Sequence, residues 1–310
     1  MFMFLNMWIY IISSNESNII SYSLIGDNMK KFFSLIGMLS LAIVSFIYTN
    51  KIVEVAKQFD DVMTTVSEVS ADYYKDPIDG IIIDNVSFIP GINGRNVNVD
   101  KSYKKMRKFG GFNKNLLEFD VIPPKNKLEN NLDKYIISGN KSKNNVSLIF
   151  IVKEYSDITN VLKILNDKNI KADFFVDGYW LEKNNELVSK IINDGNNVGN
   201  LSYNMDYQNS AFSWMDTIIK RLSHEKYGFC YSEEENLDNL KICSMNNNFT
   251  IKPNIIVKSN PLGEIKENLS NGSIISLPVN KLVDSQLLSI INYINSRGIE
   301  IVTVKELIRE

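Results

Sequence analysis

Histidine is nearly absent from this chain, because His224 is the only one among 310 residues. A site that needs two imidazole side chains, whether as metal ligands or as an acid and a base, is therefore excluded. We interpret His224 as an ordinary polar residue rather than as a catalytic one. A strong net charge is lacking too, since the formal charge at pH 7 is −2. No nucleic-acid partner is expected, because such a partner requires a clustered basic face.

Cysteine is also scarce. Cys230 and Cys243 are the only two, and their separation of thirteen residues matches neither a CxxC redox pair nor a zinc knuckle. The pair could form one disulfide if the domain is exported, or both residues could remain small, buried and apolar. We favour the second interpretation, because free cysteine is often buried.

A long apolar run stands near the front of the chain. Lys30 and Lys31 precede 19 residues without charge, and Lys51 closes the run. A membrane-spanning helix needs about 20 mostly apolar residues. The two lysines before the run predict a cytoplasmic N-terminus, and hence a single-pass cell-membrane protein whose C-terminal domain is extracytoplasmic. A signal peptide, with secretion after cleavage, is the alternative; an uncleaved anchor is favoured, because the residues after Tyr48 match a cleavage signature poorly.

The apolar run divides the chain into five segments. The first, 1–28, is interpreted as a poorly structured, over-extended start with Met29 as the natural beginning, and 29–50 is the anchor or signal. A juxtamembrane helix, a small α+β module with its linker and a large final domain follow, at 51–77, 78–145 and 146–310.

The juxtamembrane helix is predicted from apolar residues at alternating spacings of three and four, from Ile52 to Tyr73. This apolar face could pack on the chain's own domains, which we favour, or form a short coiled-coil seam.

The small module is predicted to contain a strand at 81–83, a helix at 101–108 capped by Asp100, and a strand at 116–121. A polar linker at 138–145 ends it. The predicted helix is strongly basic and could contact an anionic wall polymer or a membrane surface, although we favour a solvated helix face. Its cations are Lys101, Lys104, Lys105, Arg107 and Lys108.

Strands and helices alternate through the final domain, which predicts a parallel sheet with outer helices. The predicted strands lie at 146–152, 170–178 and 272–279, with a strand or turn at 197–203. The predicted helices lie at 156–169, 184–195 and 286–298, and the chain ends in a strand and a short helix at 299–308.

Two stretches of this domain resemble the NodB-homology polysaccharide deacetylases. They are IKADFFVDGYWLEKNNELVSKIINDGNNVGNLSYN, at 170–204, and the tail NGSIISLPVN…INSRGIEIVTVKELI. The resemblance covers about 160 residues in order and spacing. It implies an irregular (β/α) barrel, with the site at the C-terminal ends of the strands.

The resemblance also implies which side chains the family's chemistry needs. Its members bind a divalent metal, commonly zinc, through one Asp and two His, with a second Asp as base and a further His as acid. None of the matching side chains here can do this work, so we predict no metal, no cofactor and no catalytic residue. The matched positions are Ile151, Val152, Leu201, Met205 and Pro278.

Three aspartates are the nearest acidic substitutes, but two nitrogen ligands would still be missing. Capping or surface roles are therefore expected for Asp157, Asp173 and Asp177.

Aromatic residues near the expected groove could stack on sugar rings. Packing residues retained with the fold are the competing interpretation, which we favour. The candidates are Tyr179, Trp180, Tyr203, Tyr207 and Trp214.

The sequence therefore predicts a membrane-anchored, extracytoplasmic and catalytically inactive deacetylase-like protein that binds cell-envelope glycan or a partner protein. A divergent but active carbohydrate N-deacetylase, acting on chitooligosaccharide or peptidoglycan, is one alternative. A purely structural envelope protein is the other.

Overall fold

The computed structural model describes residues 19–58 and 60–310, which divide into two compact units. The first unit holds the described residues up to Ala71 together with Asn98–Glu118, and the second holds Asp72–Val97 and Phe119–Glu310. The interpretation of 1–28 as an over-extended start falls mostly outside the described residues, although 19–28 belong to the first helix.

Helix α1 (Ile19–Gln58) contains the predicted anchor. Its apolar segment Lys31–Val53 is long and hydrophobic enough to cross a membrane, and none of it is buried by the protein. A signal sequence has the same properties. The segment's length and composition are suited to a bilayer.

The rest of the first unit is a small helical layer. Helix α2 (Asp61–Ser70) packs beside α3 (Val99–Arg107), and Val66, Tyr103 and Met106 are buried. A short 3₁₀ helix, Ala71–Tyr73, follows α2 in the chain, and another, Lys114–Leu116, follows α3.

Two predictions for this region are corrected. The juxtamembrane helix is not continuous, because Asp60 is extended and its carboxylate caps α2 by accepting the N–H of Val62. The cap of α3 is Asn98 rather than Asp100, because the Asn98 side chain accepts the N–H of Lys101.

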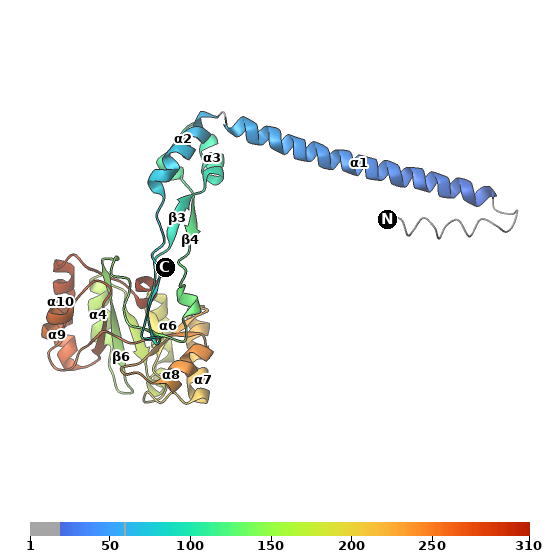
Figure 1. The fold of residues 1–310 in the computed structure, drawn as a ribbon. Helices are drawn as coiled ribbons and strands as arrows, with labels where there is room; N and C mark the ends of the chain where they lie inside the picture. Colours follow the sequence, from blue (N-terminus) through green and yellow to red (C-terminus); the bar gives the residue numbers. More distant parts are fainter. Residues whose placement is uncertain (1–18, 59) are drawn as a thin grey trace. The chain divides into compact units, whose positions relative to one another are not determined.

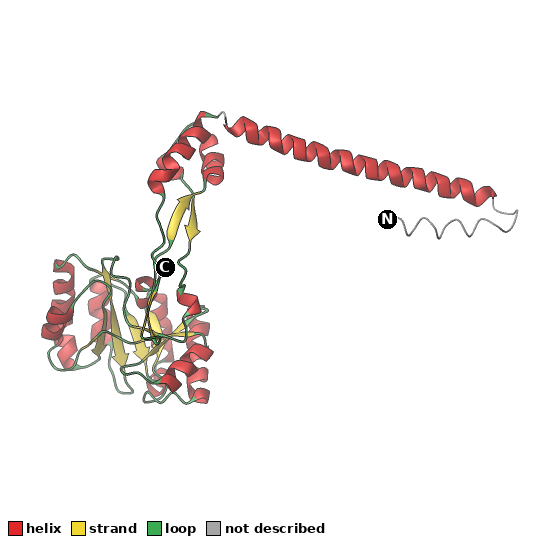
Figure 2. Cartoon of the chain, in the orientation of Figure 1, coloured by secondary structure: helices red, strands yellow, loops and turns green. Residues whose placement is uncertain are grey.

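The second unit is built on one curled, mostly parallel sheet, which forms an open half-barrel (Figures 1 and 2). Its strand order is β1-β2-β5-β10-β9-β8-β7-β6-β12-β11, with β13 paired to β6. Only β1 and β2 pair antiparallel within this described sheet. The predicted irregular (β/α) barrel is thereby confirmed. The strands are β1 (Ile81–Ile83), β2 (Ser87–Ile89), β5 (Tyr135–Ile136), β6 (Asn145–Val152), β7 (Asp173–Val176), β8 (Asn197–Asn200), β9 (Gly228–Tyr231), β10 (Asn248–Ile251), β11 (Ile255–Ile256), β12 (Ile274–Pro278) and β13 (Glu300–Ile301).

The predicted module at 78–145 is not separate from the barrel. Strands β2 and β5 pair with each other, and β5 also pairs with β10, so the module's strands extend the barrel sheet. The predicted linker is also bound to the rest of the unit. The backbone N–H of Gly139 donates to the carbonyl of Gly272, and the side-chain amide of Asn140 donates to the carbonyl of Pro90. An unpaired sheet edge leaves backbone groups exposed, and these segments cover the edge of β10. Strands β3 (Gly94–Val97) and β4 (Phe119–Ile122) pair antiparallel and form a separate two-stranded sheet.

Helices cover the outer surface of the sheet, with α4, α9 and α10 grouped on one side in Figure 1 and α6, α7 and α8 on the other. The predicted helix at 184–195 is α6, which Gly195 ends with a φ of +86°. The helices are α4 (Thr159–Asp167), α5 (Gly178–Lys183), α6 (Asn185–Asn193), α7 (Asn209–Ser223), α8 (Leu237–Met245), α9 (Pro261–Asn268), α10 (Lys281–Ser296) and α11 (Val304–Leu307), with a 3₁₀ turn at Leu128–Asn130.

Alternate side chains of the strands enter two separate cores. Along β6, Leu148 and Phe150 join the outer cluster between sheet and helices, whereas Ile149 and Ile151 join an inner cluster inside the curl. Because both faces of the strand are buried, its sequence is continuously apolar. Helix α11 fills part of the same interior with Leu307.

Candidate functional site

The positions matched to the family's metal site lie at the carboxyl ends of neighbouring parallel strands. Ile151 of β6 stands opposite Phe175 of β7 and Pro278 of β12. Phe175 in turn stands opposite Gly199 of β8, two residues before Leu201. A Cβ atom at position 199 would lie 2.4 Å from the Phe175 ring, so glycine is needed for this close approach.

Three of the five matched side chains meet in one apolar cluster. Ile151 is 4% exposed and Leu201 is 1% exposed, and both pack in the inner cluster with Phe175 and Tyr231. Met205 is partly buried against the same cluster. Apolar side chains thus fill the strand ends at the positions matched to the family's metal site.

The other two matched positions lie differently. Val152 is buried in the outer cluster, on the opposite face of β6 from Ile151. Pro278 is half-buried at the end of β12, where the following residue, Val279, donates its N–H to the carbonyl of Ile151. The structure therefore does not bring Val152 into the cluster that holds Ile151.

These residues do not fit a divalent metal. Isoleucine, valine and leucine have no donor atom, and the thioether of Met205 is too soft for a water-activating zinc site. Within 19–58 and 60–310, no group of three or more His, Cys, Asp or Glu converges to replace them. His224 caps the end of α7 in a left-handed conformation, with a φ of +56°.

A small polar network remains inside the curl, and sequence reasoning did not identify it. The hydroxyl of Tyr231 lies 2.9 Å from that of Ser276 and donates to Glu233 at 3.1 Å. The hydroxyl of Tyr207 donates to the carbonyl of Tyr231 at 2.6 Å. Burial raises the pKa of both tyrosines, so both phenols stay neutral at pH 7. No local motif marks this network, because strands and loops distant in the sequence bring its residues together.

The three candidate aspartates have structural roles. Asp177 caps α5 by accepting the N–H of Tyr179, and its other oxygen accepts the N–H of Asn204. Asp157 is accessible, and hydrogen bonds from Thr159 lower its pKa.

Asp173 lies at the opposite end of the barrel, at the start of β7. Its carboxylate accepts hydrogen bonds from Ser147, Asn197 and the N–H of Val304. Burial raises the pKa of Asp173 to about 6, although these hydrogen bonds oppose the shift. The carboxylate therefore joins β6, β8 and α11, and it is remote from the carboxyl ends of the strands.

The loop after β8 is held without any metal. Ser202, Asn204 and Met205 all have positive φ values, of 58°, 52° and 61°. The Asn200 side chain accepts the N–H of Ser202 at 2.7 Å, and Asp177 accepts that of Asn204 at 2.6 Å. Such conformations cost free energy for residues other than glycine, and these hydrogen bonds offset that cost.

Three of the candidate aromatic residues form an accessible row, which we call the aromatic rim. The Tyr179 and Tyr203 rings meet edge to face at 4.8 Å, and Tyr203 lies 6.5 Å from Trp214. Tyr179 and Trp214 are exposed, and the Tyr203 hydroxyl donates to Glu182. The rim borders the carboxyl ends of β7 and β8.

The other two aromatic candidates are corrected. Trp180 is 2% exposed and donates its indole N–H to the carbonyl of Ser156, and Tyr207 is also buried. Both rings pack in the interior, where no sugar can reach them. They therefore fit the packing interpretation.

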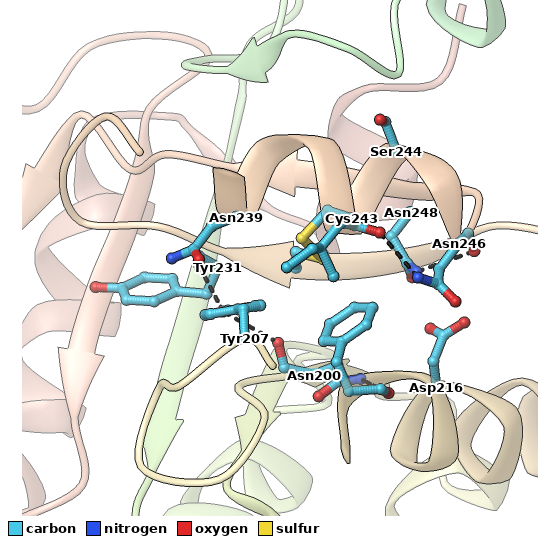
Figure 3. The surroundings of a disulfide bond; sticks show 12 residues. Asn200, Tyr207, Asp216, Tyr231, Asn239, Cys243, Ser244, Asn246 and Asn248 are labelled. Carbon is cyan, nitrogen blue, oxygen red and sulfur yellow. Dashed lines mark hydrogen bonds between the residues drawn. A yellow bond between two sulfur atoms is a disulfide. The ribbon is translucent and has the colours of Figure 1, made fainter. Parts of the chain in front are cut away.

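The two cysteines form a disulfide, which corrects the preference for free thiols. Cys230 of β9 is bonded to Cys243 of α8, with their Cα atoms 6.2 Å apart. Figure 3 shows the bond beside Tyr207 and Tyr231. Both cysteines are fully buried in a small cluster with Tyr207 and Phe212.

The amino-terminal end of the barrel is hollow. A cavity of about 720 Å³ lies against the first residues of β8, β9 and β10. Val198, Phe229 and Phe249 line its floor, and Val121 and Lys305 are among its other lining residues.

Residues 138–236 match the family model for polysaccharide deacetylase. The uncharacterized protein YlxY of Bacillus subtilis (strain 168) is 39% identical over 119 residues. That match spans 37% of this chain and 37% of the relative, so it covers little more than a third of either protein.

Solved structures share the fold. The wild-type CE4 family pseudoenzyme BA3943 from Bacillus anthracis has a TM-score of 0.62 and 23% identity, over 81% of this chain and 96% of that one. A BA3943 mutant described as having restored enzymatic activity also has a TM-score of 0.62, with 22% identity over 81% and 99%. Residues 138–236 of this chain therefore resemble a polysaccharide deacetylase domain, and the side chains at the positions matched to the family's metal site differ from those the family's chemistry needs.

Proposed function

We propose that this protein is membrane-anchored and extracytoplasmic, and that it binds cell-envelope glycan without hydrolysing it. The observation that carries the proposal is the packed inner cluster, in which Ile151 and Leu201 occupy matched metal-site positions. The structurally similar BA3943 is described as a pseudoenzyme, and one mutant of it as having restored enzymatic activity. That pairing supports inactivity through replaced side chains on an intact fold.

Two features support an extracytoplasmic domain. The apolar segment Lys31–Val53 of α1 is suited to a bilayer. The Cys230–Cys243 disulfide is suited to an oxidising compartment, because cytosolic thiols are usually kept reduced. A protease-protection assay on intact cells tests the topology: the second unit should be digested from outside, and its protection would contradict the proposal.

The aromatic rim supports glycan binding. Tyr179 and Trp214 present accessible rings next to the strand ends where the family places its site. Aromatic faces can stabilise stacked sugar rings through apolar burial.

Metal content and acetate release test the loss of hydrolysis. We expect the full chain, purified in detergent, to bind no stoichiometric zinc and to release no acetate from chitooligosaccharide or peptidoglycan. Stoichiometric zinc together with turnover would show a divergent but active N-deacetylase instead.

A pull-down on insoluble peptidoglycan and chitin tests glycan binding. The double variant Tyr179→Ala/Trp214→Ala should be retained at least fivefold less than the parent chain. Tyr74→Ala is the matched control, since Tyr74 and Trp214 are each 47% exposed. Equal retention of all three proteins would favour a structural or protein-binding role.

A further inference from the structure

The first unit carries a concentrated basic surface on α3 and the loop that follows. Between positions 101 and 117 the chain contains six cations and no acidic residue. Lys105 pairs with Glu118, while Lys104 and Lys108 are exposed. We call the following set the basic patch: Lys101, Lys104, Lys105, Arg107, Lys108 and Lys114.

Two aromatic side chains stand next to this patch. Phe109 is 74% exposed and Phe112 is also exposed, on a loop turned by Gly110 with a φ of +78°. An exposed phenylalanine costs free energy in water but is stabilised at a lipid headgroup boundary. Cations beside apolar rings are the combination that binds anionic lipid surfaces.

A short stretch of chain and one hydrogen bond keep the basic patch close to the proposed anchor. The hydroxyl of Tyr103 on α3 donates to the carboxylate of Asp60 at 3.1 Å. Asp60 follows the last residue of the apolar segment, Val53, by seven positions. Seven residues span at most about 25 Å even when fully extended. Wherever α1 enters a bilayer, α3 must therefore lie near that surface.

We propose that the basic patch, with Phe109 and Phe112, binds the surface of an anionic lipid bilayer. The cations attract the lipid phosphates, and the phenylalanine rings enter the headgroup layer. The inference rests on the proposed anchor but does not depend on glycan binding.

The test uses the full chain carrying Phe109→Trp, incorporated into lipid nanodiscs through α1. The discs contain either phosphatidylcholine alone or phosphatidylcholine with phosphatidylglycerol, each with or without brominated acyl chains. The extra tryptophan emission, relative to the parent chain, should be quenched at least twofold more in the anionic discs. Added salt should remove this difference, because it screens the headgroup charges.

A charge variant and its control identify the cause. Lys104→Glu/Lys108→Glu, added to the Phe109→Trp chain, should abolish the excess quenching. Lys163→Glu/Lys168→Glu, on α4 and at its C-cap in the second unit, changes the net charge equally and should leave the excess quenching intact. Equal quenching in both disc types, or equal loss in both charge variants, overturns the proposal.

A shift in emission with soluble polyaspartate but not with anionic discs would show a polyanion site instead. If the chain does not enter discs, α1 is not a membrane anchor and the lipid-binding proposal fails with it. The glycan pull-down does not use the discs, so it still tests glycan binding by itself.

Discussion

The two ends of the barrel differ in how they are filled. At the carboxyl end, Ile151, Leu201 and Phe175 pack tightly where the family places a metal. At the amino end, a cavity of about 720 Å³ remains against the first residues of β8, β9 and β10. In barrel enzymes the carboxyl end is the open, reactive one. Here apolar side chains have closed that end, and the accessible aromatic residues have been left at its border.

The largest expected effect is on stability, when a carboxylate is introduced at the carboxyl end of the barrel and compared with one at the amino end. Ile151→Asp should lower the free energy of unfolding by at least about 3 kcal/mol, because it buries a carboxylate without a partner. Val121→Asp is the matched variant at the cavity, where Val121 is 64% exposed, and should cost less than about 1 kcal/mol. Denaturant unfolding followed by tryptophan fluorescence measures both. Equal losses would contradict the difference in packing between the two ends.

Strand β9 joins the two ends, and the disulfide holds it to α8. Replacing both Cys230 and Cys243 by alanine should reduce stability by about 3 kcal/mol, the expectation for a loop of this length. Thermal unfolding with and without a reductant provides the check. An unchanged melting temperature in reductant would mean that the bond does not stabilise the fold.

Asp173 makes the amino end sensitive to pH. Its folded pKa of about 6 lies above the usual value of about 3.9, so the folded state resists ionisation. The parent chain should therefore lose up to about 3 kcal/mol, relative to Asp173→Asn, as the pH rises from 4 to 7. Unfolding curves at several pH values measure this difference. Parallel pH profiles for the two proteins would contradict the assignment.

The smallest expected effect concerns the aromatic rim. Trp214→Ala should change the free energy of unfolding by less than about 0.5 kcal/mol, because the side chain is half-exposed. The buried Trp180, changed to alanine, is the positive control and should cost about 3 kcal/mol or more. A large loss at Trp214 would show that the rim stabilises the fold instead of being free for a ligand.

Local patterns in the sequence predicted a parallel sheet with outer helices, and the resemblance to the deacetylase family implied the barrel. The continuous apolar run of β6 and the glycine that ends α6 were both identified correctly, within a few residues. The pairing of β5 with β10 was not, because partners more than a hundred residues apart leave no local periodicity. The short helix α5 was also missed, since its cap, Asp177, resembled the end of a strand.

The site was predictable where residue type alone decides the chemistry. The resemblance to the family's motifs implied that Ile151 and Leu201 stand where the family has a carboxylate and an imidazole, and residue type alone then excludes metal binding by them. The accessibility of neighbouring aromatics was not predictable, because Tyr179 and Trp180 differ only in the face of α5 that they occupy. The disulfide was only the less favoured alternative, because a spacing of thirteen residues says nothing about which elements carry the two sulfurs.

In the loop that follows β8, the side chains that hold the backbone are not the ones matched to the family's metal ligands. Its left-handed residues are held by the side chains of Asn200 and Asp177, and neither hydrogen bond uses the side chain at position 201 or 205. Mutations at those two positions therefore leave the loop's backbone support in place. The path of this loop therefore depends on two side chains outside the matched positions, so the support of its backbone can be tested separately from the chemistry at positions 201 and 205.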